Sequence, residues 1–146
     1  DVYKRQLIST RAGQRICIIL PRGFGKSILC KSAIMHKLCF SAEDSQNFIA
    51  WVSEEQGQAI DHLKYLRNHF ETNKMIKYYF GNMDGGSCGK RWTEKDLVTP
   101  KGDRVIAKGT SQRLRGRAEV DVRYTGIILD DFESELNTKT PDQERD

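Results

Sequence analysis

The sequence predicts an α/β fold in which helices lie on both faces of a mainly parallel sheet. A short apolar run, Ile16–Leu20, passes through a glycine-containing turn into a helical pattern at residues 28–38. A second run, Phe48–Val52, is aromatic and β-branched and precedes another helical pattern. A third, within residues 125–133, ends in carboxylates. Strands alternating with helices are typical of parallel sheets, and we expect the first and third strands near the sheet centre.

Length and composition fit a single globular domain. The chain has 146 residues, of which 38% are hydrophobic and 30% charged. Its net charge of +4 is too small to establish nucleic-acid binding. No apolar run reaches the length of a membrane span, and no signal-peptide pattern opens the chain. The four cysteines show no C-x-x-C spacing and three of them fall in apolar segments, which favours buried free thiols in a reducing compartment over a metal cluster.

Residues 1–6 look foreign to the rest of the chain. They are the translation of a sequence that resembles the transposon-end adapter used in sequencing libraries. We therefore expect residues 1–6 to be an adapter-derived scar and residues 7–146 to form one domain, truncated at both ends. A natural basic N-terminal segment is the alternative.

The first strand, turn and helix start form the context that a phosphate-binding P-loop requires. The turn is Pro21-Arg22-Gly23-Phe24, and Gly25-Lys26-Ser27 opens the helix. Backbone N–H groups there favour a polyphosphate, Lys26 would reach the β- and γ-phosphates, and Ser27 would ligate Mg²⁺. Leu20 occupies the position of the usual first glycine. The alternative is a surface turn that happens to contain Gly-Lys-Ser.

The third apolar strand supplies the acids that a P-loop enzyme needs. One acid at a strand tip holds Mg²⁺, and another polarises the attacking water. Asp130 suits the first role, and Asp131 or Glu133 suits the second. The alternative is a strand that ends in solvated acids.

The remaining segments predict supporting structure. A helix after residue 56 should place Ala59, Leu63, Leu66 and Phe70 on one face, and Ser53 to Gln56 resembles its capping box. Residues 97–109 predict a β-hairpin that turns at residues 100–103. The aromatic run 78–80 favours packing in the core over a base-stacking platform.

An arginine-rich stretch, residues 112–117, lies between the hairpin and the acidic strand. Arg123 follows it. A solvated basic loop and a phosphate-contacting loop are equally consistent with this pattern, since arginine suits phosphates of a nucleotide or of DNA.

Taken in this order, the motifs make the chain resemble the large subunit of tailed-bacteriophage terminases over residues 14–146. The segments that carry the resemblance are a relaxed Walker A motif, a tryptophan ahead of the hairpin, an arginine-rich segment, a Walker B strand and its continuation: residues 21–27, Trp92, residues 109–116, residues 127–133 and residues 137–141. That family tolerates the loss of the first Walker A glycine.

The resemblance implies an additional-strand P-loop ATPase domain that binds ATP and Mg²⁺. It matches Lys26 and Ser27 to the nucleotide and metal positions, and Asp130 to the Walker B acid. Arg22 matches an arginine that acts as a finger in cis. Asp131 stands where the family usually has the catalytic glutamate, so the base stays open between Asp131 and Glu133.

Arg123 and Arg117 match loosely to a finger acting in trans. The family also implies double-stranded DNA as substrate, a portal protein and a small terminase subunit as partners, and a homo-oligomeric ring. It further implies a nuclease domain, absent here, and a location in the cytoplasm of the bacterial host.

Two other hypotheses remain at this stage. The chain is another P-loop ATPase, such as a helicase-like DNA translocase, or an inactive truncated prophage fragment. A helicase is expected to show D-E-x-[DH] after its apolar strand, whereas this chain has Asp130-Asp131-Phe132-Glu133.

Overall fold

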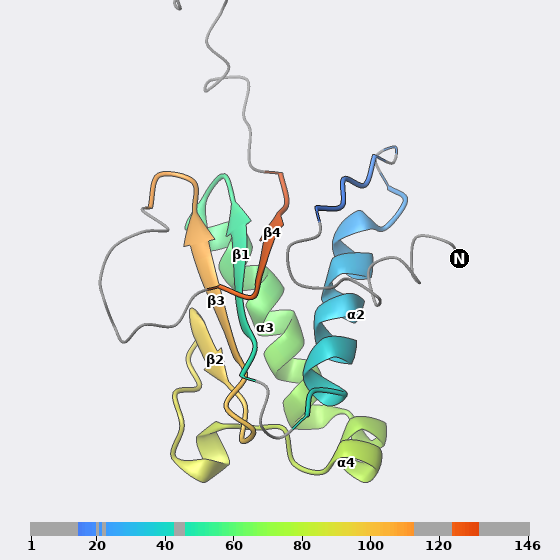
Figure 1. Ribbon diagram of the computed structural model, residues 1–146, viewed down its shortest axis with the longest axis vertical. Coiled ribbons are helices and arrows are strands. Elements are labelled where there is room, and N and C mark those ends of the chain that lie inside the picture. The colour runs from blue at the N-terminus through green and yellow to red at the C-terminus, as the bar shows by residue number, and fades with distance from the viewer. Residues whose placement is uncertain (1–14, 20, 22, 43–45, 113–123, 132–146) are drawn as a thin grey trace, which may run out of the picture.

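The computed structural model describes residues 15–19, 21, 23–42, 46–112 and 124–131 (Figure 1). Helices and strands are interspersed along the chain, which agrees with the predicted α/β class. They are α2 (Lys26–Cys39), β1 (Phe48–Ser53), α3 (Gln56–Thr72), α4 (Lys74–Phe80), the 3₁₀ turn η1 (Gly86–Cys88), β2 (Asp96–Val98), β3 (Arg104–Gly109) and β4 (Gly126–Leu129).

The four strands form one open mixed sheet in the order β2-β3-β1-β4. β1 pairs in parallel with both β3 and β4, while β2 runs antiparallel to β3. The β2–β3 pair confirms the predicted hairpin, and Gly102 takes a φ of 96° in its turn. All six residues of β1 are buried, as expected for a central strand with neighbours on both sides.

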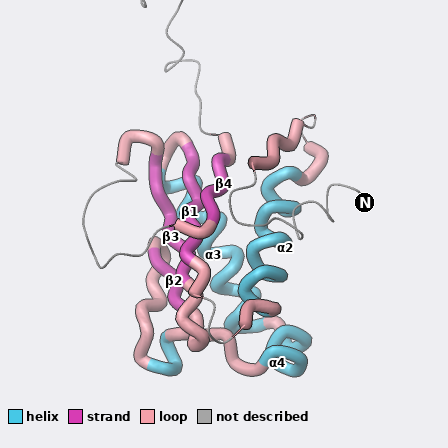
Figure 2. Tube along the Cα trace, in the orientation of Figure 1, coloured by secondary structure: helices cyan, strands magenta, loops and turns pink. Residues whose placement is uncertain are grey.

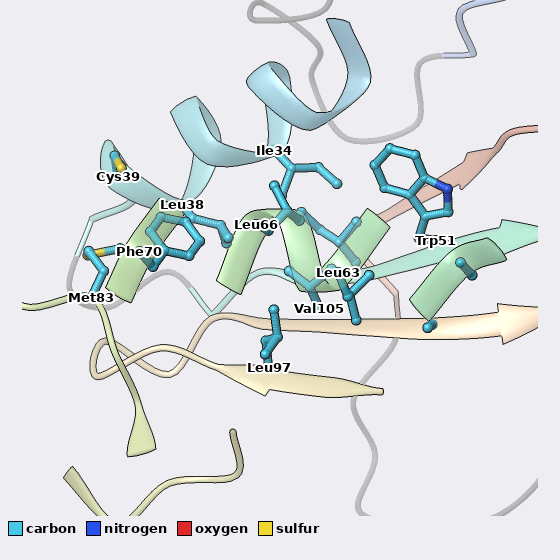
Figure 3. Close-up of a cluster of buried hydrophobic side chains, with 13 residues drawn as sticks. Ile34, Leu38, Cys39, Trp51, Leu63, Leu66, Phe70, Met83, Leu97 and Val105 are labelled. Carbon is cyan, nitrogen blue, oxygen red and sulfur yellow. The ribbon is translucent and has the colours of Figure 1, made fainter. Parts of the chain in front are cut away.

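The main core lies between the sheet and two helices. Successive strand residues face opposite sides, so Ile49, Trp51, Val105 and Ala107 share the face that α2 and α3 cover. Figure 3 shows Leu63 and Leu66 of α3 between α2 and the strands. The four predicted core positions of α3 are all essentially inaccessible to solvent, which confirms the helical period; they are Ala59, Leu63, Leu66 and Phe70.

The opposite face of the sheet corrects one prediction. Its buried residues are Phe48, Ala50, Val52 and Ile106, with Tyr124 packed against them. In the part of the chain that the structure describes, helices cover only the first face (Figure 2), so the expected cover on both faces is not found there. The apolar side chains on both faces of the strands predict that both faces of the sheet are buried. They do not predict which segments of the chain bury them.

The first predicted strand is also wrong for its described residues. Residues 15–19 are not part of any strand, and the side chain of Ile19 is 88% exposed. A strand exists only where a neighbour completes its hydrogen-bond ladder, and no described strand pairs with this segment. Leu20 lies outside the described residues.

Two further local predictions fail for similar reasons. β4 lies at an edge of the described sheet, not near its centre, and Ile127 and Leu129 are about half exposed. Tyr78 and Tyr79 of α4 are exposed, not packed in the core, because α4 turns Ile76 and Phe80 toward it instead. Among the described residues, no helix is both long enough and apolar enough to cross a membrane.

Candidate functional site

The carboxyl ends of the three parallel strands and the beginning of α2 lie at the same end of the molecule (Figure 1). Figure 1 shows α2 starting at the end toward which the arrowheads of β1, β3 and β4 point. Backbone hydrogen bonds join the strand ends: Asp130 N donates to Val52 O at 3.0 Å, and Thr110 N donates to Ser53 O at 3.0 Å. Ligand sites of open α/β sheets form at this edge.

The start of α2 has the features of an anion-binding turn. Gly23 and Gly25 take φ values of 86° and 73°, which side chains other than glycine rarely adopt. Gly25 is the N-cap, no side chain caps the helix, and the first turn holds no acidic residue. The start of the helix therefore presents the positive end of its dipole without a side-chain cap.

The predicted nucleotide-binding residues of this turn differ in exposure. Lys26 and Ser27 are half-buried in the first helical turn, whereas Pro21 and Gly23 are exposed and Phe24 is 67% exposed. Arg22 lies outside the described residues.

Asp130 follows β4 directly, and its carboxylate is largely buried. Its side chain is only 11% exposed, and Oδ2 has no hydrogen-bond partner. The imidazole of His62 in α3 lies close to this oxygen, with Nε2 3.5 Å from Oδ2 but without a hydrogen bond. A buried carboxylate oxygen without a hydrogen-bond donor destabilises a fold, so its presence needs an explanation. A ligand that binds this oxygen would provide one.

His62 is held in place by its ring. The imidazole packs against the indole of Trp51, a fully buried residue, with ring centroids 4.5 Å apart. Burial lowers the pKa of His62, and the positive charge of Lys31 lowers it further, against a smaller opposite effect of Asp130. Since its ordinary pKa is already near 6.5, His62 is neutral at physiological pH.

Cys30 connects α2 to this carboxylate. Burial raises the pKa of the Cys30 thiol, and the negative charge of Asp130 raises it further. Asp130 is therefore close enough to the second turn of α2 to act electrostatically on it. Lys26 lies four residues before Cys30, on the same face of the helix.

Asp131 makes a sharp turn immediately after Asp130. Its φ of 45° is the one positive value among the described residues other than glycine, and its carbonyl accepts from Glu54 N at 3.0 Å. Such strain often accompanies functional positions. Asp131 is exposed. The other base candidate, Glu133, and the arginines Arg117 and Arg123 lie outside the described residues.

The predicted arginine-rich stretch begins at an anchored residue. Gln112 Nε2 donates to Gln56 Oε1 at 2.9 Å, and Gln56 Nε2 donates to Ala107 O at 3.3 Å. The amide pair ties the end of β3 to the first turn of α3. Residues 113–117 lie outside the described part of the chain.

Sequence reasoning missed His62 and misjudged Ser53. His62 lies three residues after Ala59 and four before Leu66, so the helical period that located the core could have placed it beside the sheet. Ser53 was expected to cap α3, but the N-cap is Glu55 and the buried Ser53 Oγ has no hydrogen-bond partner.

The described residues hold no preformed cluster of metal-binding side chains. Among them, no three His, Cys, Asp or Glu residues lie close enough to bind a metal ion together. All four cysteines are free, as predicted, although Cys17 and Cys88 are exposed.

Comparisons with known proteins leave the family open. No family model matches the chain, and neither a curated protein nor a solved structure matches it significantly.

Proposed function

We propose that this chain is a P-loop ATPase domain of the additional-strand type, part of a DNA-packaging motor that resembles the terminase large subunit. In the full-length protein it would hydrolyse ATP to drive double-stranded DNA into procapsids. The proposal also includes a homo-oligomeric ring, a portal protein and a small terminase subunit as partners, and action in the bacterial host cytoplasm. The observation that carries it is that the Gly25-Lys26-Ser27 helix start and Asp130 lie at the same end of the sheet (Figure 1), with Asp130 near enough to act electrostatically on Cys30 of α2.

The residues present fit a magnesium ion bound together with a nucleotide. Asp130 offers a buried hard oxygen that lacks a donor, and Ser27 offers a hydroxyl in the first turn of α2. Mg²⁺ in phosphate sites takes one or two protein oxygens and fills its other positions with phosphate and water. The lack of a larger ligand cluster among the described residues is compatible with that arrangement.

The chemistry asked of the protein is mainly positioning and charge stabilisation. The magnesium ion would neutralise charge on the β- and γ-phosphates. Lys26 and the backbone N–H groups of the first turn of α2 would stabilise the charge that develops on the γ-phosphate. Asp131 or Glu133 would orient the attacking water, and Arg22, Arg117 or Arg123 would supply the finger, worth about 10³–10⁵ in rate.

Calorimetric titration with ATP and Mg²⁺ tests nucleotide binding directly. Lys26→Ala should abolish measurable binding, because it removes the ammonium group expected to contact the phosphates. Lys37→Ala is the matched control, a lysine in the last turn of the same helix. Equal binding by wild type and Lys26→Ala, or none by the wild type, would contradict the proposal and favour the inactive fragment.

The arginine-rich residues 112–117 are our candidate for coupling hydrolysis to DNA movement. Their anchor at Gln112 lies on the first turn of α3, close to the strand ends. Replacing Arg113 and Arg115 with alanine in the full-length protein should reduce DNA packaging and DNA-stimulated ATP hydrolysis. If both stay unchanged, this coupling role is wrong.

The runner-up, a helicase-like translocase, makes a different prediction about the flanking reading frame. A downstream acid-rich nuclease domain would favour the terminase proposal, and helicase motifs would favour the alternative.

A further inference from the structure

We propose that His62 is a positioning residue that orients the Asp130 carboxylate toward the metal ion. This inference rests on the proposed function, because it assigns a role to a neighbour of the proposed magnesium ligand. It concerns a residue that no sequence motif indicates, on a helix that supplies none of the predicted site residues.

The backbone around Asp130 is already fixed. Its N–H donates to Val52 O at 3.0 Å, and the carbonyl of the next residue, Asp131, accepts from Glu54 N at 3.0 Å. The freedom that remains belongs to the side chain of Asp130. Because that side chain is only 11% exposed, bulk water contributes little to its orientation.

His62 is the described side chain placed to remove this freedom. Its Nε2 lies 3.5 Å from Asp130 Oδ2, and a tilted ring contact with Trp51 restricts the rotation of the imidazole. A shift of about half an ångström brings the pair to hydrogen-bond distance. Catalytic hydrogen bonds are often long in unliganded proteins and tighten when the ligand binds.

One carboxylate oxygen can serve both partners. Oδ2 has two lone-pair directions, and a neutral imidazole with its proton on Nε2 occupies one of them. The other then has a defined direction for a metal ion or a metal-bound water. Residues that hydrogen-bond a metal ligand in this way typically change metal affinity about 10–100-fold when they are mutated.

Two substitutions separate the hydrogen bond from packing. His62→Leu fills a similar volume against Trp51 but has no donor, whereas His62→Gln keeps an N–H donor on a chain long enough to reach. His69→Leu is the matched control, since His69 lies on the same helix and its ring packs on Tyr65 at 4.5 Å. The probe is Mn²⁺, whose binding in the presence of saturating ATP is measured by electron paramagnetic resonance.

The expected result is a Mn²⁺ affinity about 10–100-fold weaker in His62→Leu, with most of the loss recovered in His62→Gln. ATP binding in EDTA should be the same in all variants, and His69→Leu should bind Mn²⁺ like the wild type. A role in packing alone predicts the reverse order, with leucine tolerated and glutamine harmful.

Unchanged Mn²⁺ affinity in His62→Leu would overturn the inference and leave the proposed ATPase function standing. A wild-type chain that binds neither ATP nor Mn²⁺ would overturn both. Should His62→Leu fail to fold, His62→Asn decides, because its shorter amide stops short of Asp130: weakened Mn²⁺ binding supports the role, and wild-type binding refutes it.

Discussion

Replacing Asp103 with alanine should destabilise the fold by about 3–5 kcal/mol. Asp103 is fully buried at the end of the β2–β3 turn, and three donors reach its carboxylate. Ser41 Oγ donates at 2.5 Å, Asn47 N at 2.7 Å and Asn47 Nδ2 at 2.8 Å. The carboxylate thereby joins the hairpin to the segment between α2 and β1.

The magnitude follows from these three hydrogen bonds. Each bond to a charged acceptor contributes about 1.5–3 kcal/mol. Truncation leaves both Asn47 donors without this partner, whereas Ser41 Oγ keeps Leu38 O as an acceptor at 3.0 Å. Ser41 and Asn47 are only half-buried, so water can replace part of the lost hydrogen bonding. The cost is therefore smaller than the sum of the three contributions. A cost of about 3–5 kcal/mol is a large part of the stability of about 5–15 kcal/mol that domains possess.

Urea unfolding followed by the fluorescence of the buried Trp51 provides the assay. The control is Asp61→Ala, because the Asp61 side chain is 76% exposed and has only a 3.7 Å contact with Lys64. That variant should stay within about 0.5 kcal/mol of the wild type. A cost below about 1 kcal/mol for Asp103→Ala would refute the reasoning that this carboxylate holds the hairpin to the core.

Three further substitutions test the structure elsewhere. A hydrogen bond from Arg67 lowers the pKa of Glu71, so Glu71 stabilises the fold above its unfolded pKa of about 4.3 and loses this effect as the pH falls through its folded pKa. The stability difference between wild type and Glu71→Gln should therefore shrink between pH 6 and pH 3 in urea titrations, and a constant difference would contradict it. Gly85→Ala should lower the melting temperature strongly, because the added Cβ would lie 1.6 Å from Val98 O; a melting temperature equal to wild type would show that the loop moves freely. An alanine Cβ at Gly57 in α3 meets nothing within 4 Å, so Gly57→Ala should raise the free energy of unfolding by about 0.5–1 kcal/mol in urea titrations, and a loss of stability would contradict this.

Local patterns predicted much of this fold correctly. The helical period located α2 and the buried face of α3, and the β-branched run at residues 48–52 located β1. Turn chemistry located the β2–β3 hairpin. These features succeed because the side chains that determine them are close together in sequence.

The predictions that failed depend on partners distant in the chain. Residues 16–19 have the composition of a strand, but a strand also needs a neighbour, and composition does not supply one. The same limit applies to the edge position of β4. His62 and Asp130 lie close together only because α3 packs against the sheet beside β1 and β3, so no local motif predicts their proximity.

The pairing of β1 has a consequence for how the chain folds. Its hydrogen-bonding neighbours, β3 and β4, both come from much later in the sequence, and β2 is the next strand in the chain yet does not touch it. Closing such long loops costs entropy before any ladder forms, which slows folding of proteins with distant contacts. During synthesis, both edges of β1 therefore stay unpaired until β3, which begins at residue 104, and β4, which begins at residue 126, have been made. Unpaired strand edges favour aggregation, so the nascent chain is most prone to aggregate during this interval.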